Sequence, residues 1–139
     1  MPIQLTEDLK TAINNARADG FPMLVASVDA TDQPSMSIRG SLQTYSDDSL
    51  AMWVRNADGG LLKSVEAHPL IALWYRNTAT NTAFLMHGEA RRVDDEAVKQ
   101  QVYDASPEGE RNQDPERKGT ALVIDLIRVI QRGQVLMER

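Results

Sequence analysis

The sequence predicts a mainly β (α+β) domain, a small antiparallel barrel of about six strands with short helices packed at its ends. Short runs of alternating or continuous apolar residues follow one another from residue 23 to the C-terminus. Turn-forming residues separate most of these runs, which favours hairpins. The chain shows no regular alternation of strands and helices, and this excludes a doubly wound parallel sheet.

The first predicted element is a helix close to the N-terminus. Its apolar residues recur at helical spacing: Leu5, Leu9, Ala12, Ile13 and Ala16. Thr6 is suited to the N-cap and Gly20 to the position just after the helix. We expect this helix to cover one end of the barrel.

The strands are predicted from the remaining apolar runs. They cover residues 23–28, 35–41, 50–55, 70–75, 82–93 and 120–130, and the first two form a hairpin. Residues 70–75 are apolar at every position, which predicts a strand covered on both faces, and Gly88 indicates a bulge in its own strand. Short helices are expected at residues 61–67 and after Asp94. Residues 104–119 are polar and form a long connection, expected to be functional or mobile.

Composition and charge limit the classes of function. The chain has 139 residues, of which 42% are hydrophobic and 25% charged, so we expect one domain spanning residues 1–139. The net charge of −5 disfavours nucleic acid as a partner. No apolar run approaches the ~20 residues of a membrane span. The first residues lack the features of a signal peptide, so we expect a cytoplasmic protein without a membrane partner.

Few residues are suited to metal or nucleophile chemistry. The chain has no cysteine and only two histidines, so the usual nitrogen and sulfur ligand sets for zinc are missing and no metal site is expected. His68 is placed to cap a helix end, and His87 either packs in its strand or lines a pocket. No nucleophile elbow, Walker loop or dinucleotide fingerprint is present.

Two segments could bind a phosphate. In residues 35–41 the alternation places three serines and Arg39 on one face, and Gly40 would let a flat ligand approach the backbone. The alternative is an ordinary solvent-exposed face. Gly59 and Gly60 precede a short helix whose free N–H groups can bind an anion, with Lys63 in its first turn. The alternative there is a plain turn followed by a solvated lysine.

Four segments, in their order and spacing, resemble the pyridoxamine 5′-phosphate oxidase-like family of FMN-binding split barrels. They are LVASVDATDQPSMS (residues 24–37), LAMWVR (50–55), LKSVEAHPLIALW (62–74) and FLMHGEA (84–90). The resemblance extends over about residues 21–133, and residues 114–119 are similar to a segment in one branch of the family. It implies a six-stranded antiparallel split β-barrel, and a homodimer that binds FMN at the subunit interface.

The resemblance also implies which residues bind the cofactor. The positions that match are Ser37, Ile38, Arg39, Gly40, Trp53, Val54, Arg55, Lys63 and Gln134. The chain departs from the family at four of its motif positions. Gly60 and Leu61 replace a basic pair, and Ser37 and Leu42 replace the arginine and lysine of an Arg-x-x-x-Leu-Lys pattern. Phosphate binding would therefore depend on Arg39, Arg55 or Lys63, and pyridoxamine phosphate is disfavoured as the substrate.

The function implied by the resemblance is an FMN-dependent oxidoreductase acting on a small molecule. The absence of an obvious acid–base dyad agrees with this, since hydride transfer to a flavin requires none. One alternative is a non-catalytic protein that binds flavin, a deazaflavin or haem. The other is an empty split barrel that serves as a structural dimer.

Overall fold

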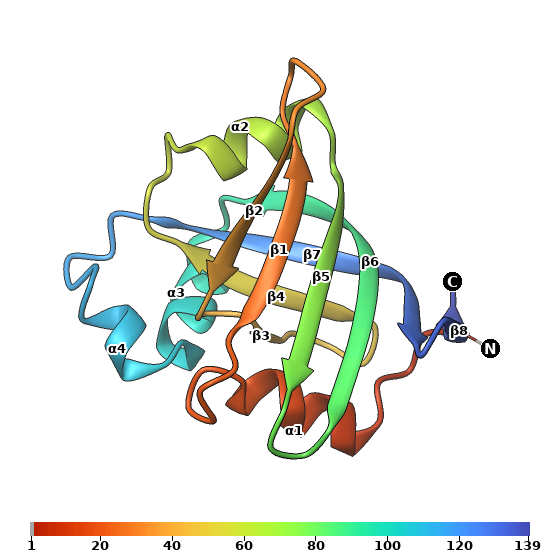
Figure 1. Cartoon of the computed structure of the whole chain (residues 1–139). Coiled ribbons are helices and arrows are strands. Elements are labelled where there is room, and N and C mark those ends of the chain that lie inside the picture. Colours follow the sequence, from red (N-terminus) through yellow and green to blue (C-terminus); the bar gives the residue numbers. More distant parts are fainter. Residues whose placement is uncertain (1) are drawn as a thin grey trace.

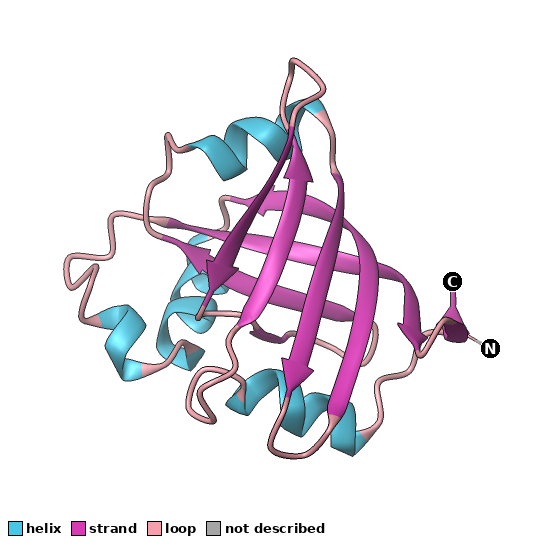
Figure 2. Ribbon diagram, in the orientation of Figure 1, coloured by secondary structure: helices cyan, strands magenta, loops and turns pink. Residues whose placement is uncertain are grey.

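The computed structural model describes residues 2–139 and confirms a mainly β architecture. Over these residues, one antiparallel sheet curls into an open half-barrel with the strand order β2-β1-β5-β6-β7-β4-β3, and β8 pairs with β7 (Figures 1 and 2). The strands are β1 (Met23–Val28), β2 (Pro34–Arg39), β3 (Gln43–Thr44), β4 (Ser49–Val54), β5 (Leu70–Asn77), β6 (Thr82–Val93), β7 (Thr120–Gln131) and β8 (Gln134–Glu138). The prediction of six strands is corrected to eight, because β3 and β8 are short and lack a distinct apolar pattern.

Four helices accompany the sheet in the described part of the chain. They are α1 (Glu7–Asn15), α2 (Gly60–Ala67), α3 (Glu96–Ala105) and α4 (Glu108–Arg111). Helix α1 closes one end of the half-barrel and α2 lies at the other, near the tip of the β1–β2 hairpin, while α3 and α4 lie beside β4 (Figure 1). Helix α4 falls inside the polar connection, where no helix was predicted. None of the helices in residues 2–139 has the length and apolar character needed to cross a membrane.

The first helix and the hairpin agree with the sequence. Thr6 Oγ1 accepts a hydrogen bond from the Leu9 N–H at 3.2 Å and so caps α1, whose C-cap is Ala16. Gly20 was predicted directly after the helix but lies beyond the Ala16 C-cap, at the end of the turn that follows, where its φ of +86° favours glycine. Strands β1 and β2 pair from Met23 opposite Arg39 to Val28 opposite Pro34.

The core lies inside the curl of the sheet and continues on the other face of β4. Leu50 and Met52 point into the half-barrel, while Ala51 and Trp53 pack under α3, so every residue of β4 is buried. The register of β6 and β7 shifts between His87 and Gly88, which confirms the predicted bulge.

Strand β5 is covered on one face only, which corrects the expectation of cover on both. Ile71, Leu73 and Tyr75 are buried in the core, whereas Trp74 is 40% exposed.

The register places an apolar row on the outside of six strands, which we call the outer sheet face. It consists of Ile38, Leu24, Trp74, Leu85, Ile130 and Val135. Such a continuous apolar surface is typical of a face that binds another molecule.

Candidate functional site

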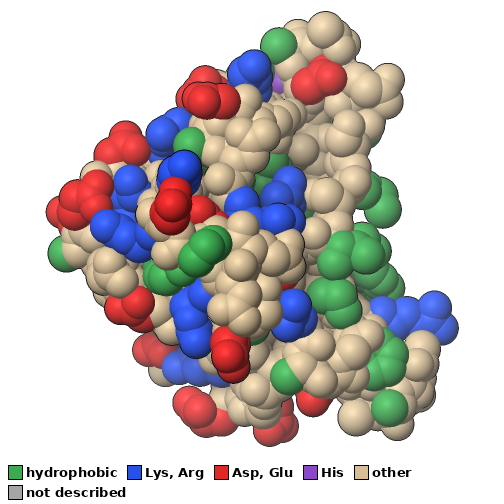
Figure 3. All heavy atoms as spheres, turned by 90° about the vertical axis from the view of Figure 1, so that its left-hand side faces the viewer, with side chains coloured by type: hydrophobic (Ala, Val, Ile, Leu, Met, Phe, Trp, Pro, Cys, Tyr) green, Lys and Arg blue, Asp and Glu red, His purple; other side chains and the backbone are tan. Residues whose placement is uncertain are grey.

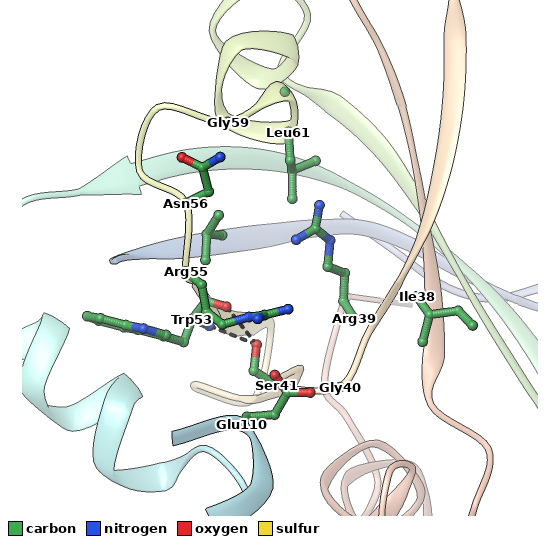
Figure 4. A pocket seen from close by; sticks show the side chains of 12 residues that line it. Ile38, Arg39, Gly40, Ser41, Trp53, Arg55, Asn56, Gly59, Leu61 and Glu110 are labelled. Carbon is green, nitrogen blue, oxygen red and sulfur yellow. Dashed lines mark hydrogen bonds between the residues drawn. The ribbon is translucent and has the colours of Figure 1, made fainter. Parts of the chain in front are cut away.

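Two hollows meet where β2 and β4 end and α2 begins. The first has a volume of about 530 Å³ and is lined by residues 38–41, 53–56 and 59–61 and by Glu110 (Figure 4). The second, of about 470 Å³, lies between the polar face of the β1–β2 hairpin and α2. Arg39, Gly60 and Leu61 line both hollows. The two therefore form one groove with Arg39 at their junction.

The alternation predicted for β2 is confirmed, and the polar face is the one turned towards the groove. Ser37 and Arg39 are part-buried, and the Arg39 Nε donates a hydrogen bond to Ser37 Oγ at 2.9 Å. The apolar side chains of the same strand face outwards, with Met36 68% and Ile38 64% exposed. The serine–arginine face is therefore part of a concave site and not an ordinary solvent-exposed surface.

Three basic residues in the groove lack a carboxylate partner. No carboxylate of residues 2–139 lies within 4.0 Å of the charged groups of Arg39, Arg55 or Lys63. Burial lowers the pKa of Arg39, and the nearby positive charge of Arg55 lowers it further. Several basic side chains gather near the centre of the face shown in Figure 3, with acidic side chains beside some of them. The three cations outnumber the two carboxylates that line the groove, Asp29 and Glu110, and this excess of positive charge favours an anionic ligand.

Trp53 supports the floor of the first hollow through its backbone. Ser41 Oγ accepts a hydrogen bond from the Trp53 N–H at 3.0 Å and donates one to the Trp53 carbonyl at 2.9 Å. The indole points away from Arg39 (Figure 4), and its Nε1 donates to Asp114 Oδ2 at 2.9 Å. The ring also meets Tyr103 of α3 edge-on, with the ring centres 5.2 Å apart.

Asp114 organises the polar connection that follows α4. Besides the Trp53 indole it accepts the backbone N–H groups of Lys118 at 2.9 Å and Gly119 at 2.8 Å. Burial acts to raise the pKa of Asp114, but the hydrogen bonds from Lys118, Trp53 and Gly119 outweigh burial and the pKa is lowered. The ionised carboxylate therefore joins the connection to the end of β4, beside the groove.

The structure adds two site residues that the sequence did not indicate. Glu110 of α4 lines the first hollow, and Arg17, which follows α1, lies with its Nε 3.3 Å from Glu110 Oε1. A side chain at Gly40 would overlap both groups, so the space beside this glycine is occupied by the ion pair. No local pattern could have shown this, because the three residues are far apart in the sequence. Gly40 itself still lines the first hollow, so the approach of a flat ligand to its backbone stays a prediction.

One predicted site residue and both histidines lie outside the groove. Gln134 begins β8, is exposed, and pairs with Gln131 of β7. His68 Nε2 is 3.3 Å from Asp32 Oδ1, and His87 lies on the outside of β6, where its Nδ1 is 2.9 Å from Arg128 Nη1. Among residues 2–139 no three metal-ligating side chains are grouped. The two hollows of a single chain are thus lined by all the predicted cofactor residues except Gln134.

Comparisons with known proteins identify the fold. No family model and no curated protein matches the sequence. HupZ of Group A Streptococcus superposes with a TM-score of 0.69 over 97% of this chain and 98% of its own, at 20% identity. An FMN-binding protein of Syntrophomonas wolfei superposes with a TM-score of 0.66 over 87% of this chain and 82% of its own, at 11% identity. A Clostridium acetobutylicum protein of the pyridoxinephosphate oxidase family is related to general stress protein 26. It superposes with a TM-score of 0.64 over 91% of this chain and 93% of its own, at 10% identity. These likenesses confirm the split-barrel fold that the sequence resembles.

Proposed function

We propose that this chain binds FMN in the groove formed by the two hollows, with the phosphate on Arg39. The observation that carries the proposal is the group of three cations, Arg39, Arg55 and Lys63, without carboxylate partners at the edge of a ligand-sized hollow. The same fold occurs in a protein described as FMN-binding, which agrees with this ligand. A phosphate dianion would give these three cations the anionic partner that no carboxylate of residues 2–139 provides within 4.0 Å.

The shape and lining of the groove fit a molecule with one apolar and one anionic end. Each hollow falls within the roughly 300–1,000 Å³ of small-ligand sites. Val54 and Leu61 give the first hollow an apolar wall for a flavin ring, whereas the Ile38 side chain faces outwards at its edge. Arg39 is shared by both hollows, so it reaches the phosphate whichever hollow holds the ring. Arg55 lines only the first hollow and Lys63 only the second, so variants of these two distinguish the two orientations.

We further propose a homodimer that forms through the outer sheet face. Ile38 belongs both to this face and to the first hollow, so a partner docked on the face would close the groove. The opposite end of the apolar row is Val135, next to Gln134. In a twofold dimer each end of a row can meet the other end of its partner's row. This arrangement would bring Gln134 to the neighbouring chain's cofactor, and would unite all the predicted site residues.

The reaction class proposed is oxidoreduction of a small molecule. Bound FMN would supply the hydride and electron chemistry. The chain would contribute Arg39 to hold the phosphate, the apolar wall to orient the ring, and the second subunit to exclude water. A non-catalytic flavin carrier would have the same groove, so turnover distinguishes the two functions.

The test is a fluorescence titration of the purified protein with FMN and with riboflavin, which lacks the phosphate. We expect saturable binding of FMN and at least roughly tenfold weaker binding of riboflavin, since one charge-assisted contact contributes at least about 1.5 kcal/mol. A protein that leaves FMN fluorescence unchanged and stays colourless is an empty barrel. Oxidation of a nicotinamide donor by the FMN-loaded protein would support an enzyme, and its absence would favour a carrier.

A further inference from the structure

Arg17 occupies a socket built from two separate segments. Its side chain lies between the loop after β2 and helix α4, with Glu110 as its carboxylate partner at 3.3 Å. A Cβ at Gly40 would lie 2.9 Å from Arg17 Cδ, and one at Gly109 would lie 2.7 Å from Arg17 Nη1. Any residue other than glycine at either position would displace the guanidinium. The socket therefore fixes where the charge of Arg17 lies.

The partner of Arg17 is a wall residue of the cofactor groove. The Glu110 side chain is 17% exposed and lines the first hollow with Arg39 and Arg55 (Figure 4). Its negative charge reaches Arg39, where it opposes the lowering of the pKa by burial and by Arg55. Nevertheless Glu110 is more than 4.0 Å from both guanidinium groups and pairs with Arg17 instead.

We propose that Arg17 is a positioning residue that keeps Glu110 away from Arg39 and Arg55, so that these two remain free to bind the phosphate. The inference rests on the proposed binding of FMN. A carboxylate and a phosphate compete for the same guanidinium donors, because both accept paired N–H groups in the same geometry. Without Arg17, Glu110 would be a part-buried carboxylate in the same hollow as Arg39 and Arg55, neither of which has a carboxylate within 4.0 Å among residues 2–139. Pairing with them would block the anion site from within the chain.

A role in stability alone accounts poorly for this arrangement. The Arg17 side chain is 37% exposed, and an ion pair at such a site stabilises a fold by only about 0–1 kcal/mol. Arg17 also has no other carboxylate within 4.0 Å among the described residues. The clearest consequence of the Arg17–Glu110 ion pair is that it fixes where the negative charge of Glu110 lies in the groove.

The experiment compares the affinity for FMN and riboflavin of the wild type with that of four variants. Arg17→Met should weaken FMN binding roughly tenfold, the effect of losing about one favourable charged contact. The double variant Arg17→Met/Glu110→Gln should return to within about threefold of the wild type, because the competing charge is gone. Arg17→Lys keeps the positive charge and should also stay within about threefold. Arg91→Met is the matched control, since it breaks the exposed pair with Asp125 outside both hollows and should leave FMN binding unchanged.

Three results would overturn the proposal: no loss of FMN affinity in Arg17→Met, a loss that persists in the double variant, or an equal loss for riboflavin. The last two would mean that Arg17 only supports the fold of the pocket. If the wild type does not bind FMN, the proposed function is wrong. Inorganic phosphate then replaces FMN in the same comparison, with thermal stabilisation as the measurement, and the same pattern of loss and rescue is required.

Discussion

Replacing Arg39 by alanine tests the assignment of the phosphate most sharply. Arg39 lies at the junction of the two hollows, is part-buried, and has no carboxylate partner within 4.0 Å among residues 2–139. Within the same residues its one side-chain hydrogen bond is that from Nε to Ser37 Oγ, which leaves the two terminal nitrogens available to a ligand. The substitution therefore removes a charged donor that a phosphate would use, while few contacts of the fold are lost.

The expected size of the effect follows from the type of contact. A hydrogen bond to a charged group contributes about 1.5–3 kcal/mol, which corresponds to a loss of FMN affinity of roughly 10- to 150-fold. Riboflavin lacks the phosphate, so its affinity should change less than about threefold. The free energy of unfolding without flavin should change by no more than about 0.5 kcal/mol, because the lost contact with Ser37 is offset by relief of the repulsion from Arg55.

The assay is a fluorescence titration of the parent and Arg39→Ala with both flavins, accompanied by urea unfolding of the unliganded proteins. Arg91→Ala serves as the control for loss of one arginine outside the groove. An equal loss for FMN and riboflavin would refute the reasoning, because it would indicate a collapsed pocket. Unchanged FMN affinity would indicate that Arg55 or Lys63, and not Arg39, binds the phosphate.

Further predictions concern the interface, the pH dependence and the polar connection. Trp74→Glu places a charge in the apolar row of the outer sheet face, and should convert the dimer to monomer at micromolar concentration in sedimentation velocity. Burial, and secondarily Arg128, lowers the pKa of His87. The unfolded chain then takes up a proton that folded His87 does not, so stability should fall as the pH drops below about 6.5. His87→Gln should reduce this fall in urea unfolding, and an unchanged fall would contradict its assignment to His87. Asp114→Asn should destabilise the fold by about 1–3 kcal/mol in urea unfolding, because one of its N–H donors is left buried without an acceptor; unchanged stability would contradict the role of Asp114.

Local patterns predicted the elements whose environment is set by neighbouring residues. The alternation in β2 and the turn before it specify the hairpin, and Gly88 marks the bulge where β6 bends. Strand β5 shows the limit of this reasoning. Its continuous apolar run predicts cover on both faces, but the sequence does not say whether that cover comes from the same chain.

The sequence predicted those groove residues that stand out within a single strand or turn. It did not predict those that come together only through tertiary packing. Arg39 and Lys63 stand out in their own segments, and the structure brings them into adjoining hollows. Glu110 and Arg17 could not be predicted, because their pairing depends on the packing of α4 beside Gly40. Helix α4 contributes Glu110 to the groove through tertiary packing, which no local sequence pattern indicates.

Sedimentation velocity with simultaneous detection of protein at 280 nm and flavin at about 450 nm tests the central claim most directly, which is that two chains share the binding of FMN. We predict that FMN sediments with a species of twice the 15.5 kDa chain mass, with one flavin for each chain. Flavin that remains in the solvent, or that sediments with the 15.5 kDa monomer, would contradict the account.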